Sequence, residues 1–213
     1  PLRDLLAEVV DFEQLRATGK VRLVTSATNV RTGRIKVFPG SAATVDTVLA
    51  SACLPLMFQA VEIDGEHYWD GGYMGNPPIY PLIYHCESRD VLLVTINPIV
   101  IDEVPTDARA ILDRINTLSF NSNLMREMRA INFVSRLIDE GFDDGGRLKR
   151  MLLHCIDAED EMRKLDVSSK LNASWDFLMY LHELGRHRAA AFLAAHFDKL
   201  GRESSISIEE RFL

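Results

Sequence analysis

The pattern of apolar residues changes once along this 213-residue chain, at a proline-bounded linker from Pro98 to Pro105. Before the linker the apolar runs are short and separated by turn residues, which is typical of strands alternating with short helices. After the linker the apolar residues recur mostly at helical spacing. We therefore expect an α/β domain over residues 1–105 and a mostly helical extension over residues 106–213 that packs on it.

Composition narrows the class of protein. The chain is 47% apolar and 26% charged, with three cysteines and a net charge of −7. This apolar fraction excludes a disordered chain, and the size allows a substantial core. Three distant cysteines without a C-x-x-C spacing indicate free thiols. Lys and Arg are not clustered along the sequence, so we do not expect a nucleic-acid partner. We find neither a targeting pattern nor an apolar run of the ~20 residues that a membrane span needs, and we expect a cytoplasmic protein.

Local patterns predict the individual elements. Before the linker they predict helices over Leu2–Arg16, Thr44–Cys53 and Tyr80–His85, a hairpin of Val21–Thr25 with Arg34–Phe38, short strands over Ala60–Asp64 and His67–Trp69, and a buried parallel strand over Val91–Ile96. After it they predict one or two helices over Thr106–Asp139 with Thr106 as the cap, a short apolar segment over Met151–Ile156, and helices over Ala158–Leu165, Trp175–Leu181 and Arg188–Leu200.

The stretch most informative about chemistry is a strand that ends in Asp70 and is followed at once by Gly71 and Gly72. Glycines after a strand permit positive φ and let another backbone or a substrate approach closely. The carboxylate should then lie at the carboxyl end of a strand, where open α/β sheets bind their ligands. The tripeptide alone is more typical of a turn with a solvated aspartate. Trp69, Tyr73 and three nearby prolines favour a more elaborate site.

Three segments in a fixed order, Ala50–Pro55, Val61–Gly65 and Tyr68–Pro77, resemble the second half of a patatin-like phospholipase catalytic domain. The family pattern there is A-S-x-x-x-P, a short hairpin, and D-G-[GA] followed by N-x-P. Further segments resemble bacterial members of the family: Val10–Glu13, Asn29–Gly33, Ser169–Asn172 and Leu184–Arg186.

This resemblance implies a three-layer α/β hydrolase fold with a parallel-type central sheet, present here in part. It also implies a lipid acyl-ester hydrolase that uses a Ser–Asp dyad without a metal or organic cofactor. Asp70 matches the family's aspartate, which would accept the serine proton and pass it to the leaving alcohol. Gly71 and Gly72 match the turn that holds this aspartate. A carboxylate with an ordinary pKa near 3.9 is a weak base, so burial or a hydrogen bond must tune it.

The sequence departs from the family at the nucleophile. The family serine lies in a G-x-S-x-G elbow and the oxyanion hole is a Gly-rich loop, but here no serine lies two residues before or after a glycine. In the family both elements precede the stretch where this sequence begins. We therefore expect the chain to be the C-terminal part of a longer protein, inactive alone. Its partners would be a lipid or acyl-ester substrate, the upstream segment of the same protein and, transiently, a membrane surface.

An alternative from another class is a catalytically silent binding or scaffolding module whose helical tail mediates self-association.

Other candidate sites are weaker. Strand alternation places His67 and Asp70 on opposite faces, and the pairs His85–Cys86 and His154–Cys155 indicate core packing rather than a metal site. The acidic run Asp157–Glu161 lacks the spacing of a calcium loop and is interpreted as a solvated helix start.

Overall fold

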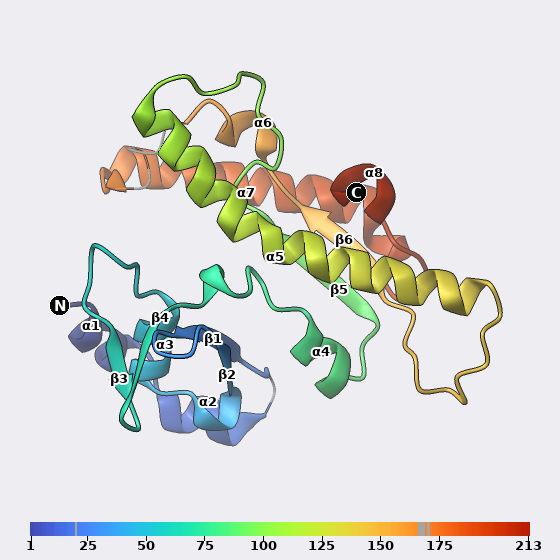
Figure 1. Ribbon diagram of the computed structural model, residues 1–213, viewed down its shortest axis with the longest axis horizontal. Coiled ribbons are helices and arrows are strands. Elements are labelled where there is room, and N and C mark those ends of the chain that lie inside the picture. The colour runs from blue at the N-terminus through green and yellow to red at the C-terminus, as the bar shows by residue number, and fades with distance from the viewer. Residues whose placement is uncertain (20, 166–168, 170) are drawn as a thin grey trace. The chain divides into compact units, whose positions relative to one another are not determined.

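The computed structural model describes residues 1–19, 21–165, 169 and 171–213 and shows a mixed α/β protein (Figure 1). The chain divides into two compact units. The first unit comprises residues 1–81 together with 119–124, and the second comprises residues 82–118 and 125–213. The predicted domains, 1–105 and 106–213, remain a prediction. The Ser169–Asn172 block includes position 170, which lies outside the described residues.

The first unit contains two-thirds of the strands. Its elements are α1 (Leu2–Val9), α2 (Phe12–Thr18), β1 (Val24–Asn29), β2 (Ile35–Pro39), the 3₁₀ turn η1 (Gly40–Ala42), α3 (Val45–Ser51), β3 (Val61–Ile63), β4 (Glu66–Asp70) and the 3₁₀ turn η2 (Gly71–Tyr73). The single helix predicted over Leu2–Arg16 is wrong. The Asp11 side chain accepts the Gln14 N–H at 2.8 Å and caps a second helix.

Four strands form one antiparallel sheet in the order β2-β1-β4-β3. The predicted hairpin is confirmed, although its first strand, β1, spans Val24–Asn29 rather than the predicted Val21–Thr25. The parallel pairing expected for this sheet is not found among these strands. Short turns join β1 to β2 and β3 to β4, and only antiparallel neighbours can be joined by such turns.

The core of this sheet lies against α3. It is a cluster of Ala27, Phe38, Ala50 and Tyr68, with the Phe38 and Tyr68 rings edge to face at 5.7 Å. Asp70 pairs directly with Ala27 across β1 and β4. Cross-strand partners project from the same face of a sheet. The Asp70 side chain therefore leaves the strand on the core face rather than on the face turned away from α3.

The second unit contains the remaining two strands and the long helices. Its elements are α4 (Tyr80–His85, where the chain passes into this unit), β5 (Asp90–Val94), α5 (Ala108–Asp139), β6 (Leu152–Ile156), α6 (Glu159–Met162), α7 (Trp175–His196), the 3₁₀ turn η4 (Phe197–Lys199) and α8 (Ile208–Phe212). The strands β5 and β6 pair in parallel, as predicted for the first of them. Only one face of β5 is buried, because Leu92 and Val94 are 46% and 70% exposed.

Three predictions in this part of the chain need correction. Asp107 rather than Thr106 caps α5, since its side chain accepts the Ala110 N–H at 3.0 Å. The two stretches predicted at the tail, Trp175–Leu181 and Arg188–Leu200, are one continuous helix, α7, over Trp175–His196. The acidic run does begin a helix, α6, but its carboxylates are also ion-paired, and the Asp160 side chain stays 60% exposed in its pair with Arg188.

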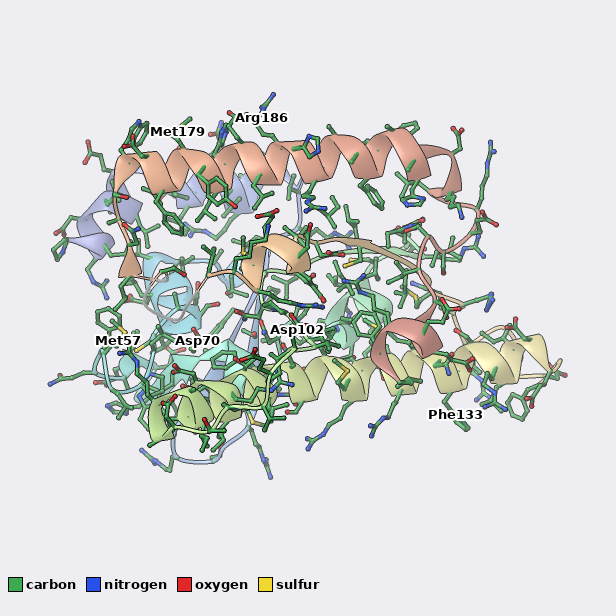
Figure 2. The ribbon with its side chains drawn as sticks, turned by 90° about the horizontal axis from the view of Figure 1, so that it is seen from above. Met57, Asp70, Asp102, Phe133, Met179 and Arg186 are labelled. Atoms are coloured by element: carbon green, nitrogen blue, oxygen red, sulfur yellow. The ribbon has the colours of Figure 1, made fainter. Side chains whose placement is uncertain are left out.

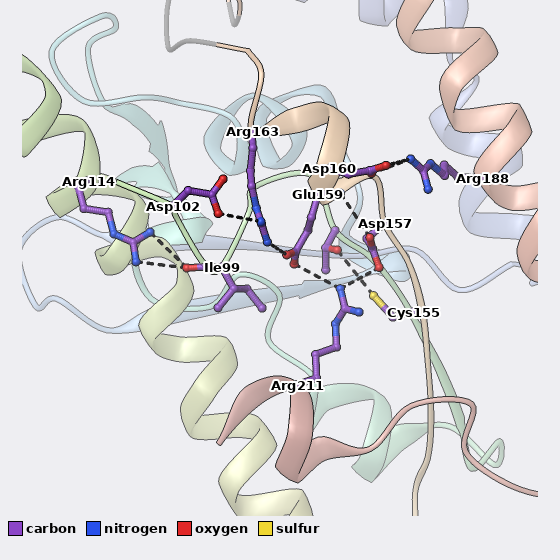
Figure 3. Close-up of polar contacts among 11 residues, drawn as sticks. Ile99, Asp102, Arg114, Cys155, Asp157, Glu159, Asp160, Arg163, Arg188 and Arg211 are labelled. Atoms are coloured by element: carbon purple, nitrogen blue, oxygen red, sulfur yellow. Dashed lines mark hydrogen bonds and ion pairs between the residues drawn. The ribbon is translucent and has the colours of Figure 1, made fainter. Parts of the chain in front are cut away.

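The acidic run is the centre of an ion-pair network (Figure 3). The pairs are Arg211 with Asp157 at 2.8 Å, Arg211 and Arg163 with Glu159 at 3.3 Å each, Arg163 with Asp102 at 3.3 Å, and Arg188 with Asp160. Arg188 and Arg211 come from distant segments, which sequence spacing does not reveal, whereas Arg163 lies only four residues after Glu159. The network joins α7 and α8 to α6, so we assign it to the stability of this unit.

His154 is the centre of a second polar cluster and is fully buried. Its Nε2 lies 3.0 Å from Asp90 Oδ1 and its Nδ1 lies 3.1 Å from Ser205 Oγ. Asp90 also accepts the Gly201 N–H at 2.7 Å, and this bond and the histidine lower the pKa of Asp90. The core position predicted for His154 is confirmed, whereas His85 is exposed, so the core packing predicted for the His85–Cys86 pair is wrong for its histidine. Through these hydrogen bonds the cluster connects the segment 201–205 to β5 and β6.

Replacement of His154 by alanine is expected to lower the free energy of unfolding by about 3 kcal/mol, because it opens a cavity and leaves Asp90 and Ser205 without their partner. Urea denaturation followed by circular dichroism measures this change. The control is His182→Ala on the exposed part of α7, which we expect to stay within about 0.5 kcal/mol of the parent. Equal stability of the two variants would show that the cluster contributes nothing.

Candidate functional site

Asp70 is the last residue of β4 and is half-buried (Figure 2). Its backbone N–H donates to the Cys53 carbonyl at 2.8 Å, and its carbonyl accepts the Thr28 hydroxyl at 2.8 Å. Its carboxylate Oδ1 accepts the Gly72 N–H at 2.7 Å. Within the described residues Oδ2 has no hydrogen-bond partner. One carboxylate oxygen is therefore held in place while the other is left for a further group.

The electrostatic environment makes this carboxylate a better base than a solvated one. Burial raises the pKa of Asp70, and the Gly72 N–H offsets part of that rise. Tyr73 and Cys53 are titratable neighbours, and burial together with the Asp70 charge raises the pKa of both. Both are therefore neutral where Asp70 titrates. The Cys53 thiol donates to the Gln59 carbonyl at 3.1 Å, an arrangement that does not favour a thiolate nucleophile.

The glycines after Asp70 are required by close approach rather than by positive φ. Neither Gly71 nor Gly72 is among the glycines with positive φ. A Cβ at Gly71 would lie 2.1 Å from the Ser26 carbonyl oxygen, and a Cβ at Gly72 would lie 2.4 Å from Phe120 Cε1. The sequence predicts that another backbone or a substrate approaches these glycines closely. In the structure the groups that do so are Ser26 of β1 and Phe120 of α5.

The structure brings the three predicted site residues together in one turn, because η2 follows β4 without a break. His67 does not join them. It is exposed, and its Nε2 lies 3.9 Å from Glu62 Oε2, so no His–Asp pair forms, as expected from strand alternation. Sequence reasoning missed Phe120 and Asn123, which contact the turn from α5. They are about 50 positions away from it, and no local pattern signals the contact.

A separate cavity of about 750 Å³ lies within the second unit, with Ile101, Arg114, Phe177 and Leu181 among its lining residues. It does not include any of the predicted site residues. In the described part of the chain, no three His, Cys, Asp or Glu side chains gather in a way that could hold a metal ion. None of the described helices combines the length and the apolar character needed to cross a membrane.

Comparison with known proteins finds a similarity over the part of the chain that contains the turn. The family model described as patatin-like phospholipase matches residues 1–83. No curated protein matches the chain. The matched region contains β1–β4, η2 and Asp70, whereas most of the second unit lies beyond it. Residues 1–83 of this chain are therefore similar to the patatin-like phospholipase family.

Proposed function

We propose that this chain is part of a lipid acyl-ester hydrolase in which Asp70 is the base of a Ser–Asp dyad. The observation that supports the proposal most is the Asp70 carboxylate, half-buried at a strand end inside the family-matched region. Its Oδ1 is fixed by Gly72 and its Oδ2 is unpaired within the described residues. This arrangement suits a group that must hold its orientation while it receives a proton.

The chemistry requires two steps. In the first, Asp70 accepts the proton of a serine hydroxyl as the serine oxygen attacks the ester carbonyl. The C–O bond to the alcohol then breaks, and the alcohol leaves with that proton. In the second, Asp70 accepts a proton from water, which attacks the acyl-serine; the acid is released and the proton returns to the serine. The nucleophile would come from outside these 213 residues, since the G-x-S-x-G pattern does not occur in them.

The same proposal extends to the architecture and the setting. Residues 1–105 would form the C-terminal part of a three-layer catalytic domain, and residues 106–213 a helical extension packed on it. The substrate would be a lipid or another acyl ester, reached through transient contact with a membrane surface, and self-association through the helical extension is compatible with this arrangement. Neither step requires a metal or an organic cofactor.

A serine-reactive probe tests this proposal. The polypeptide that combines this chain with an elbow serine should react with a fluorophosphonate at that serine and should hydrolyse p-nitrophenyl esters of fatty acids. The 213-residue chain alone is the control, and we expect it neither to be labelled nor to hydrolyse these esters. Hydrolysis that persists after complete labelling would refute the serine mechanism. A folded protein that neither reacts nor hydrolyses would favour the silent binding module.

A further inference from the structure

One short part of α5 groups with the first unit. Residues Ser119–Leu124 belong to that unit, although they lie beyond the family-matched region, which ends at residue 83. Leu124 is buried, whereas Ile115 and Leu118, in the preceding turns of the helix, are 54% and 50% exposed. The helix is therefore anchored in this unit by a few residues only, and two of them contact η2.

Phe120 lies against the side of Gly72 from which a side chain would project. A Cβ placed on Gly72 would meet Phe120 Cε1 at 2.4 Å and Asp70 Oδ1 at 3.0 Å, so the ring and the carboxylate both lie next to the same point. The Phe120 ring also packs on Tyr73, with the ring centroids 4.7 Å apart and the planes at 50°. An apolar ring in this place keeps water away from one side of the carboxylate.

Asn123 lies one helical turn further along and adds a polar contact. Its side-chain Nδ2 donates to the Tyr73 carbonyl oxygen at 3.1 Å. Tyr73 ends η2, and Gly72, the residue before it, donates to Asp70 Oδ1. The turn is thus fixed at its start by the packing of Gly71 on Ser26 and at its end by α5.

We propose that Phe120 and Asn123 are positioning residues, through which α5 fixes the Gly71–Tyr73 turn and so the orientation and solvation of the Asp70 carboxylate. This inference rests on the proposed function for its catalytic consequence, but its structural part is independent of that function. It also makes the catalytic site depend on a helix outside the family-matched residues.

The test uses the 213-residue chain and two measurements at Asp70 itself. We expect Phe120→Ala to move the pKa of Asp70, followed by ¹³C carboxyl NMR, down towards its ordinary value of 3.8, because water regains access. We expect Asn123→Ala to raise the hydrogen-exchange rate of the Gly72 amide by about tenfold or more. Phe120→Leu, which retains an apolar side chain, should restore most of the parent pKa. Ser122→Ala is the control, since its hydroxyl donates to Ser119 within the helix.

A merely structural role of α5 makes a different prediction. It would lower stability while leaving the pKa of Asp70 and the Gly72 exchange rate unchanged, and that result would overturn the inference. In the polypeptide that carries the nucleophile, Phe120→Ala should lower kcat about tenfold with little change in KM and move the acidic limb of the pH profile to lower pH. If the NMR changes occur but Asp70→Asn leaves hydrolysis intact, the positioning holds and the proposed function is refuted.

Discussion

Asp70→Asn is expected to lower kcat/KM for ester hydrolysis by about 10³-fold in the polypeptide that supplies the nucleophilic serine. The amide oxygen of asparagine can still accept the Gly72 N–H, so the turn should keep its shape. An amide cannot accept a proton from the serine hydroxyl at neutral pH. The change therefore removes the base and leaves its surroundings in place.

Stability measurements separate this loss from unfolding. Burial raises the pKa of Asp70 above its unfolded value, so ionised Asp70 destabilises the fold, and that cost grows as the pH rises through the folded pKa. Asp70→Asn should therefore be at least as stable as the parent at neutral pH in urea denaturation. Asp64→Asn, at the exposed turn of the β3–β4 hairpin, is the matched control and should retain full activity. Undiminished hydrolysis by Asp70→Asn would end the assignment.

Gly71→Ala is expected to give the largest loss of stability, about 3 kcal/mol or more. Its Cβ would lie 2.1 Å from the Ser26 carbonyl oxygen and 2.4 Å from the Ser26 hydroxyl oxygen. Ser26 cannot withdraw easily, because it lies in β1, which pairs with both β2 and β4. Either the sheet or the turn must shift.

Fluorescence of Trp69 can report the unfolding of the first unit in urea, in a Trp175→Phe background that removes the tryptophan of the second unit. Gly33→Ala in the β1–β2 turn is the control. Its φ is +65° but a Cβ there meets nothing within 4 Å, so we expect a loss of only about 1 kcal/mol from backbone strain. Equal losses at the two positions would show that the contact with Ser26 is relieved without cost.

The two hairpins and the turn after β4 could be predicted from local sequence. The turn residues are sufficient to locate β1–β2 and β3–β4, because the two strands of each hairpin lie within a few residues of one another. The bounds of β1 were not predicted, since only Val24 and Thr25 of the predicted strand Val21–Thr25 lie in it. The candidate base was located by the resemblance of the segment around D-G-G to the patatin-like family. The break between α1 and α2 was missed because Asp11 lies within a continuous helical pattern and acts as a cap only through its hydrogen bond to Gln14.

Local sequence therefore determined which segments form strands and where the candidate carboxylate lies. Only the tertiary structure decided what surrounds it: Ser26 against Gly71, and Phe120 and Asn123 against the turn. It likewise paired the acidic run with arginines of α7 and α8. Periodicity and turn chemistry act over a few residues, whereas burial, a raised pKa and ion pairing arise from packing between segments that are distant in the sequence.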